Sequence, residues 1–289
     1  MIDDYISLEK ELYQAEPVFK KREVFDIDYF VCIFVDYPKY RPFRLNEITE
    51  LCFLYCQTED FRLKLLKRGF NRCPILIYNL FHMNVFSFSE IEEKLLDFRQ
   101  VFLCQYYYEY INDFEKFIYG YDLGVTNGIK DISSYIKFGF HPKSIEYCLK
   151  YDDLEVLRDL LMDPNANNQK ETVYSPFEWS NVTNPLEFLP FSAYFGSMQC
   201  FKYLMMNGHP INKEVAFNAI ACGSFDILHL CQDFSRSCYE FINAATEYCQ
   251  YTIFDYICNN SVIISASENG FDLNLILYLP FMLLRKQVI

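Results

Sequence analysis

The chain has 289 residues, enough for one extended repeat array or two small domains, and 52% of them are hydrophobic, including 29 Phe and 24 Tyr. The apolar residues recur at helical rather than alternating spacing, which predicts an all-α protein with an extensive packed interior. A net charge of −13 argues against a nucleic-acid partner, because phosphate binding needs a basic surface. The best basic candidate, Lys20-Lys21-Arg22, is typical of a solvated helix end.

The N-terminal part has the pattern of several amphipathic helices in series. Asn46 is a candidate cap for one helix, and the next is expected to stop at Gly69. Pro74 suits the first turn of the helix that follows. Ser89 and Glu92 form a capping-box pattern before a longer helix.

A glycine-rich stretch marks the best candidate boundary in the chain, with Gly120, Gly124 and Gly128 close together. We therefore expect an N-terminal helical domain over residues 1–125 and a repeat region over residues 126–289. The spacing of the three glycines matches neither the dinucleotide-binding pattern nor the P-loop, so no nucleotide cofactor is expected.

The segment from Asn184 to Asn212 carries the clearest repeat pattern. Gly196 and Gly208 stand where two successive helices would end, and glycine accepts the left-handed turn that closes a helix. Between them, the buried face of the second helix is expected to contain apolar residues at helical spacing: Cys200, Phe201, Tyr203 and Leu204. Asn212 then stands at a turn-forming position. The order and spacing are those of one ankyrin repeat.

The same register recurs along the chain when Gly196 is taken as the reference, at Asp152, Gly223, Cys249 and Gly270. Most of these steps are shorter than the roughly 33 residues of a full ankyrin repeat, so the units are expected to be shortened. The interval before Gly196 contains extra sequence instead, including the only tryptophan, Trp179. The pattern predicts a helical N-terminal region followed by a degenerate ankyrin-repeat-like α-solenoid.

Three stretches are distinctive in sequence: Ser175-Pro176-Phe177-Glu178-Trp179, Phe191-Ser192-Ala193-Tyr194-Phe195-Gly196-Ser197, and Cys200-Phe201-Lys202-Tyr203-Leu204. Together they resemble a family of protist ankyrin-repeat proteins that carry an N-terminal helical domain of unknown function. The upstream residues 136–140 and 144–148 are also similar to that family. The resemblance implies a non-catalytic scaffold whose helical solenoid binds another protein.

The partner-binding residues implied by this resemblance are Asn207, His209 and Pro210, near the tip of the one well-formed finger. The alternative is that these three residues only shape a turn. Two other functions stay open. The N-terminal helices could carry an unrecognised activity, or the chain could be a decayed paralogue without a partner.

Twelve cysteines are scattered at apolar helical positions, and the acidic N-terminal residues do not resemble a secretory signal. We therefore expect reduced core thiols in a cytoplasmic protein.

A metal site is the other role that cysteines could have. Cys52 and Cys56 lie one helical turn apart, with His82 a conceivable third metal ligand. Since the chain has neither a C-x-x-C nor a paired-histidine motif, no metal site is expected.

No combination of residues indicates catalysis. The adjacent carboxylates Asp152 and Asp153 are expected in an exposed turn between two helices rather than in acid–base catalysis.

The apolar run from Leu273 to Leu284 is shorter than the roughly 20 residues that a spanning helix needs, so no membrane span is expected.

Overall fold

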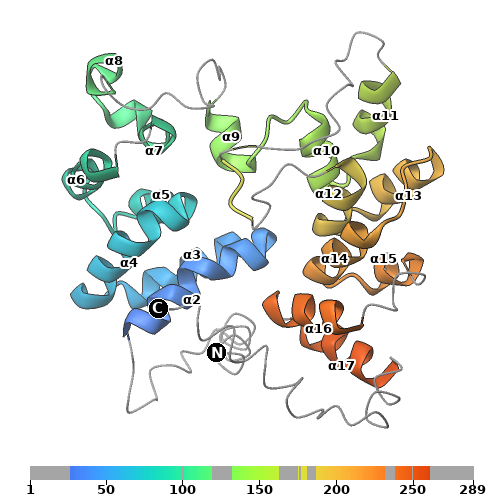
Figure 1. The fold of residues 1–289 in the computed structure, drawn as a ribbon. Helices are drawn as coiled ribbons and strands as arrows, with labels where there is room; N and C mark the ends of the chain where they lie inside the picture. The colour runs from blue at the N-terminus through green and yellow to red at the C-terminus, as the bar shows by residue number, and fades with distance from the viewer. Residues whose placement is uncertain are drawn as a thin grey trace. The chain divides into compact units, whose positions relative to one another are not determined.

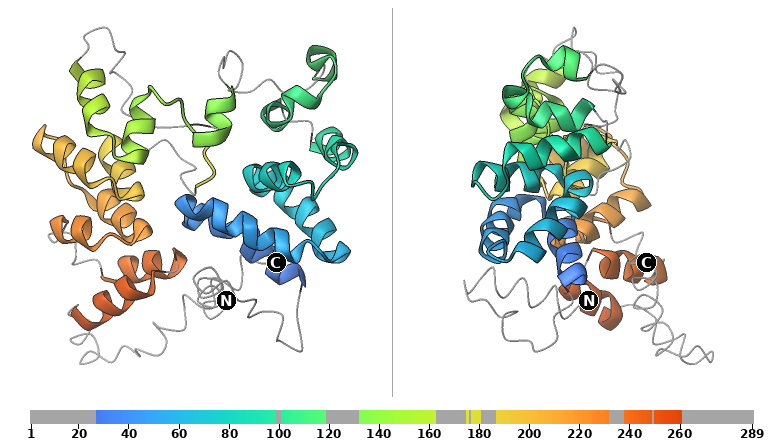
Figure 2. Two further views of the ribbon diagram at one scale, coloured as in Figure 1. Left: turned by 180° about the vertical axis from the view of Figure 1, so that it is seen from behind. Right: turned by 90° about the vertical axis from the view of Figure 1, so that its left-hand side faces the viewer.

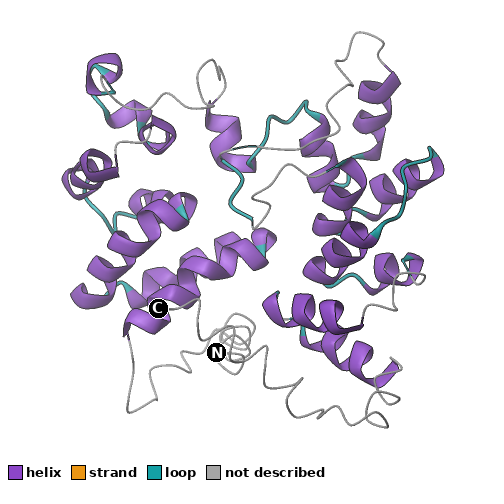
Figure 3. Ribbon diagram, viewed as in Figure 1, coloured by secondary structure: helices purple, strands orange, loops and turns teal. Residues whose placement is uncertain are grey.

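The structure, a computed structural model, describes residues 27–98, 101–118, 132–162, 175, 177–180, 187–231, 238–248 and 250–260. Within these ranges every regular element is a helix and none is a strand (Figure 3), which confirms the all-α class. Among the described helices, none combines the length and the hydropathy that a membrane-spanning segment requires. The run Lys20-Lys21-Arg22, the boundary expected after residue 125 and the apolar run of 273–284 lie outside the described residues.

The chain divides into two compact units. Residues 1–142 group with 174–183, and residues 143–173 group with 184–289. The described elements of the first unit are all helical (Figure 1): α2 (Ile27–Tyr40), η2 (Pro42–Arg44), α3 (Leu45–Tyr55), α4 (Glu59–Arg72), α5 (Pro74–His82), α6 (Phe88–Phe98), α7 (Val101–Tyr106), η3 (Tyr108–Tyr110), α8 (Phe114–Phe117) and α9 (Ile132–Phe138).

The core of the first unit is aromatic. Helix α2 packs against α3 and α4, and α5 packs against both of these. Phe30 contacts the ring of Tyr55 edge-on at a centroid distance of 4.9 Å, and Phe34 contacts Phe61 in the same way at 5.7 Å. All four rings are buried, and such edge-to-face pairs add to the stabilisation from burial alone.

Two expected helix ends differ in the structure. Gly69 does not end a helix, because α4 continues to Arg72. A Cβ atom at Gly69 would lie 2.8 Å from Cδ1 of Ile77, so the glycine permits the close approach of α5. Asn46 lies inside α3, whose N-cap is Arg44 without a side-chain hydrogen bond. Pro74 occupies the first turn of α5, as expected.

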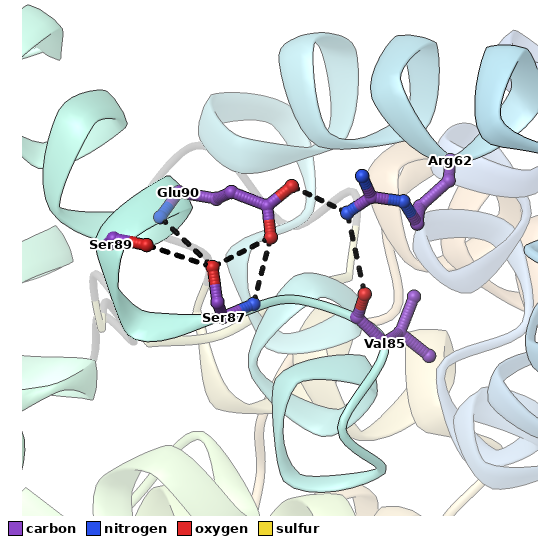
Figure 4. A network of polar contacts seen from close by, with 5 residues as sticks. All are labelled: Arg62, Val85, Ser87, Ser89 and Glu90. Carbon is purple, nitrogen blue, oxygen red and sulfur yellow. Dashed lines mark hydrogen bonds and ion pairs between the residues drawn. The ribbon is translucent and has the colours of Figure 1, made fainter.

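The capping box of α6 is formed by Ser87 and Glu90 rather than by Ser89 and Glu92 (Figure 4). The Ser87 backbone N–H donates to Glu90 Oε2 at 2.9 Å, and the Glu90 N–H donates to Ser87 Oγ at 3.4 Å. Arg62 of α4 donates to Glu90 Oε1 at 2.5 Å and to the Val85 carbonyl at 3.4 Å. The box therefore also joins α6 to α4.

Among its described residues, the second unit has four successive helix pairs: α10 (Ile145–Tyr151) with α11 (Leu154–Met162), α12 (Phe188–Phe195) with α13 (Met198–Met206), α14 (Lys213–Cys222) with α15 (Phe225–Leu230), and α16 (Cys238–Glu247) with α17 (Tyr251–Asn260). The first helices form one layer, in which α12 contacts α10 and α14, and α14 contacts α16. The second helices lie beside them in the same order (Figures 1 and 2). The pairs are thus stacked in chain order.

Each first helix is closed by the same backbone bond. The N–H of Ser197 donates to the Ser192 carbonyl at 2.9 Å, and the N–H of Ser224 donates to that of Ala219 at 3.0 Å. Equivalent bonds run from Asp153 to Cys148 and from Gln250 to Ala245, at 3.0 and 2.7 Å. This is the Schellman closure, which requires a left-handed residue in the turn.

The left-handed residue stands where the register places it in three of the pairs. Asp152, Gly196 and Gly223 have φ values of 60°, 69° and 84°. A non-glycine residue such as Asp152 is uncommon in the left-handed conformation, although aspartate tolerates it better than most other residue types. Cys249 and Gly270 lie outside the described residues.

Candidate partner-binding surface

The second helices expose their outward faces along the stack. Polar and charged residues dominate there, and the exposed positions are Glu155, Arg158, Asp159, Gln199, Lys202, Asp226, His229, Thr252 and Asp255. Large apolar side chains are exposed at the ends of three of these helices: Met162 is 72% exposed, Met206 82% and Leu230 41%. This combination of polar faces and apolar ends is the candidate partner-binding surface.

The turn after α13 is an exposed part of this surface. Its backbone follows the Schellman pattern, with the His209 N–H donating to the Leu204 carbonyl at 3.2 Å and the Gly208 N–H donating to that of Met205 at 3.1 Å. Gly208 has a φ of 91°, and a Cβ atom there would meet nothing within 4 Å. The turn is thus conformationally defined but open to solvent.

Asn207, His209 and Pro210, the predicted partner-binding residues, lie together in this turn. Asn207 and Pro210 are exposed, and Asn207 donates from Nδ2 to the Tyr203 carbonyl at 2.8 Å. The half-buried His209 ring lies 6.4 Å from that of Phe188. Two of the three side chains are therefore accessible, while His209 also helps to seat the turn.

The turn ends where α14 begins. Asn212 is the N-cap of this helix, and its Oδ1 accepts the Val215 N–H at 3.0 Å. Asn212 was expected at a turn-forming position, but its backbone is extended and its role is that of a helix cap. Both ends of the turn are thus fixed by hydrogen bonds, which limits the conformational entropy that a partner would have to remove.

Behind the surface, polar side chains join successive pairs. The Ser197 hydroxyl donates to the Leu149 carbonyl at the end of α10. Gln250 occupies the corresponding position two pairs later, and its Nε2 donates to the Ala221 carbonyl of α14 at 2.7 Å. Each of these bonds satisfies a carbonyl that a helix end would otherwise leave unpaired.

The paired carboxylates Asp152 and Asp153 are structural. Asp152 accepts the backbone N–H groups of Gln199 and Cys200 at the start of α13. Asp153 Oδ1 accepts the Val156 N–H at 3.2 Å and so caps α11. Both residues are half-buried in the interhelical turn, which is less exposed than expected.

The thiols whose side chains the structure describes are nearly all buried. Burial raises the pKa of Cys56, Cys73, Cys104 and Cys148 to about 12 each, and that of Cys231 to about 11. These groups are therefore protonated at neutral pH, whereas a nucleophile or a metal ligand requires the thiolate.

The conceivable metal ligands do not converge within the described ranges. Cys52 lies near Cys56 and Cys73, while His82 packs against the ring of Tyr78 at 4.4 Å. No group of three or more His, Cys, Asp or Glu side chains is placed to hold a metal ion in this part of the molecule. The other histidines also lie beside aromatic rings: His141 beside Tyr135, His209 beside Phe188 and His229 beside Tyr256.

No family model matches this chain, and no curated protein or solved structure matches it at a significant level. The resemblance to the protist ankyrin family accordingly stays a prediction.

One part of the candidate surface was not foreseen from the sequence. Met206 and Met162 are the most exposed large apolar residues described, each at the last position of a second helix. The signal was present in the helical spacing, because Met206 falls outside the buried stripe of Cys200, Phe201 and Leu204.

Proposed function

We propose that this chain is a non-catalytic protein–protein interaction scaffold whose second unit is a degenerate ankyrin-type solenoid. The observation that carries the proposal is the identical closure of four successive first helices at Asp153, Ser197, Ser224 and Gln250. A repeated local structure of this kind is expected when one supersecondary unit is stacked several times. Stacked repeats create extended concave surfaces, which repeat proteins use for binding.

The partner is proposed to bind the turn after α13 and the neighbouring second helices. Met206 supplies an apolar anchor that is 82% exposed, with Asn207 and Pro210 beside it. Flexible methionine side chains adapt to apolar partner surfaces, and desolvated apolar anchors dominate binding energy. Lys202 on the same helix would contribute a charge at the rim of such an interface.

The proposed partner is another protein. The proposal assigns the chain neither a nucleic-acid partner nor a cofactor. The net charge of −13 opposes phosphate binding. A cytoplasmic location is part of the proposal, since buried reduced cysteines are typical of a reducing compartment.

The test compares three full-length chains as baits in a lysate of the native cell, followed by mass spectrometry. The first bait is the wild type and the second carries Met206→Ser with His209→Ala. The third, a matched control, carries Leu96→Ser in the first unit, where Leu96 of α6 is 53% exposed. We expect a partner that the wild type and the control retain and the turn variant loses.

Affinity is then measured with the purified partner by calorimetry. Loss of a central apolar anchor is expected to weaken binding by about 1–3 kcal/mol, roughly tenfold or more. A partner lost by the Leu96 variant but kept by the turn variant would place binding in the first unit and contradict the proposal.

A further inference from the structure

A short segment that comes late in the chain belongs to the first unit. Residues 174–183 group with residues 1–142, although the chain on both sides of them groups with the second unit. We call the described part of this stretch, Ser175 and 177–180, the aromatic segment. Its contacts within the first unit define a docking site.

The main anchor of the segment is Phe177. Its side chain is 1% exposed, and its ring lies 5.5 Å from that of Tyr106 and 5.9 Å from that of Tyr135. Burial, with Cys73 and Glu178 nearby, raises the pKa of Tyr106 above its usual value. This agrees with a tyrosine side chain that is shielded from water where the segment contacts it. An aromatic side chain between two tyrosine rings is a typical anchor of a peptide interface.

The second anchor is Trp179, the only tryptophan of the chain. Its indole N–H donates to the carbonyl of Pro42 at 3.2 Å, across 137 residues of sequence. The half-buried indole thus presents an apolar body to the unit and uses its single donor on the backbone. The two anchors are two residues apart and reach different elements, α7 and α9 in one case and η2 in the other.

The rest of the segment supports its own shape. The Ser175 hydroxyl accepts the Phe177 N–H at 3.2 Å, and Glu178 Oε1 accepts the Ser180 N–H at 3.0 Å. Such local bonds preorganise a short peptide for binding. The fit is incomplete, because the buried Ser180 hydroxyl finds no partner among the described residues.

We propose that the first unit carries a docking site for a Phe-x-Trp peptide, and that a second copy of this chain can fill it, so that two chains exchange their aromatic segments. A second copy is the proposed occupant, since every copy of the chain carries the segment that fits this site. Exchange of an identical element preserves each contact and is a low-cost route to a dimer. In one chain the tethered segment has an effective concentration of about millimolar, so exchange requires a high protein concentration.

The first experiment uses the full chain with Phe177→Ala, a substitution that removes the main anchor of the chain's own segment from the docking site. The probe is a fluorescein-labelled peptide of residues 172–183, and the readout is fluorescence anisotropy. We expect saturable binding to the variant and at least about tenfold weaker binding to the wild type, whose site is filled by its own segment. The matched control peptide, with Phe177→Ala, is expected not to bind.

The second experiment tests the exchange itself. Wild-type chain is unfolded, refolded at high concentration and separated by size-exclusion chromatography with light scattering. A dimer is expected from the wild type and from the control Leu96→Ala, which alters a residue of α6 that is 53% exposed, but not from Phe177→Ala. A dimer whose yield Phe177→Ala leaves unchanged would overturn the exchange.

The proposal also fails if the folded Phe177→Ala chain binds the two peptides equally weakly. Should this variant lose its helical circular dichroism signal, Trp179→Phe takes its place, since it removes the donor to Pro42 and keeps a smaller aromatic ring. This variant is expected to bind the wild-type peptide more tightly than the wild-type chain does. Equal affinities would overturn the docking site.

Discussion

Oδ1 of Asp152 lies 2.9 Å from the backbone nitrogen of Cys200 and accepts its hydrogen bond. The same carboxylate accepts the Gln199 N–H through Oδ2, at 3.2 Å. Since Asp152 itself ends α10 at a φ of 60°, one residue closes the first helix of one pair and caps the second helix of the next. Asp152 therefore contributes both to the repeated closure of the first helices and to the stability of the contact between successive pairs.

Replacing Asp152 with alanine is expected to lower the free energy of unfolding by about 1–3 kcal/mol, because the cap is lost and alanine is strained in the left-handed region. Asp152→Asn keeps an acceptor and tolerates that region, so it should cost less than about 1 kcal/mol. Urea denaturation followed by circular dichroism measures both. Equal losses would show that the side chain does not cap α13.

Truncating Leu204, which is fully buried in α13, is expected to cost about 2–5 kcal/mol as Leu204→Ala. Met206→Ala is the matched control two residues away, and since Met206 is 82% exposed it should change stability by less than about 0.5 kcal/mol. The same denaturation experiment applies. A change below that value for Leu204 would mean that the repeat register is wrong.

Two glycines with positive φ should respond differently to alanine. Gly208→Ala is expected to cost about 1 kcal/mol, because only the backbone is strained. Gly196→Ala should cost about 1 kcal/mol more, since its Cβ would lie 2.7 Å from Sγ of Cys222. Adding Cys222→Ala should recover part of this difference in a double-mutant cycle. Additive losses would contradict a contact between the two positions.

The capping box of α6 should make the first unit sensitive to acid. Burial alone would raise the pKa of Glu90, but hydrogen bonds from Ser87 and Arg62 outweigh it, and the net effect lowers the pKa. A carboxyl with a lowered folded-state pKa stabilises above its unfolded pKa and loses this contribution as pH falls through the folded value.

We therefore expect the stability difference between wild type and Glu90→Gln to shrink as pH falls from about 5 to about 3. At pH 7 the variant should be less stable by about 1 kcal/mol. Thermal unfolding across this pH range, followed by circular dichroism, measures the difference. A constant difference would mean that the carboxylate charge plays no part.

Buried thiols should resist alkylation. At pH 8, iodoacetamide is expected to label the half-buried Cys222 before Cys73, whose pKa burial raises to about 12. Mass spectrometry after brief exposure gives the order of labelling, and the chain in guanidinium chloride is the control. Labelling of Cys73 as fast in the native chain as in guanidinium would contradict its burial.

Local rules account for the part of this fold that the sequence predicts. The turns at Gly196 and Gly223 follow from the conformational freedom of glycine and the adjacent helical spacing. The cap at Asn212 follows from its own side chain and the next three residues. Gly69 shows the limit, because a glycine can end a helix or admit a neighbouring one, and only the position of Ile77 distinguishes these cases.

Contacts between distant residues could not be predicted in this way. The bonds from Gln250 to Ala221 and from Trp179 to Pro42 join side chains to backbone carbonyls of other elements. Repeat spacing gives the order of the helices but not which polar side chain reaches a given carbonyl. In the candidate surface, Asn207, His209 and Pro210 were predicted from the resemblance, whereas Met206 was missed although it falls outside the buried stripe of α13.

The bond from Ser197 to Leu149 spans 48 residues and has a consequence for synthesis on the ribosome. The carbonyls that end α10 leave the exit tunnel before the hydroxyl that satisfies them has been made. At typical translation rates of about 5–20 residues per second, α10 waits about 2–10 s for this donor. The nascent first pair is therefore expected to be completed only when the second pair emerges, so that the unit is assembled in the order in which it is translated.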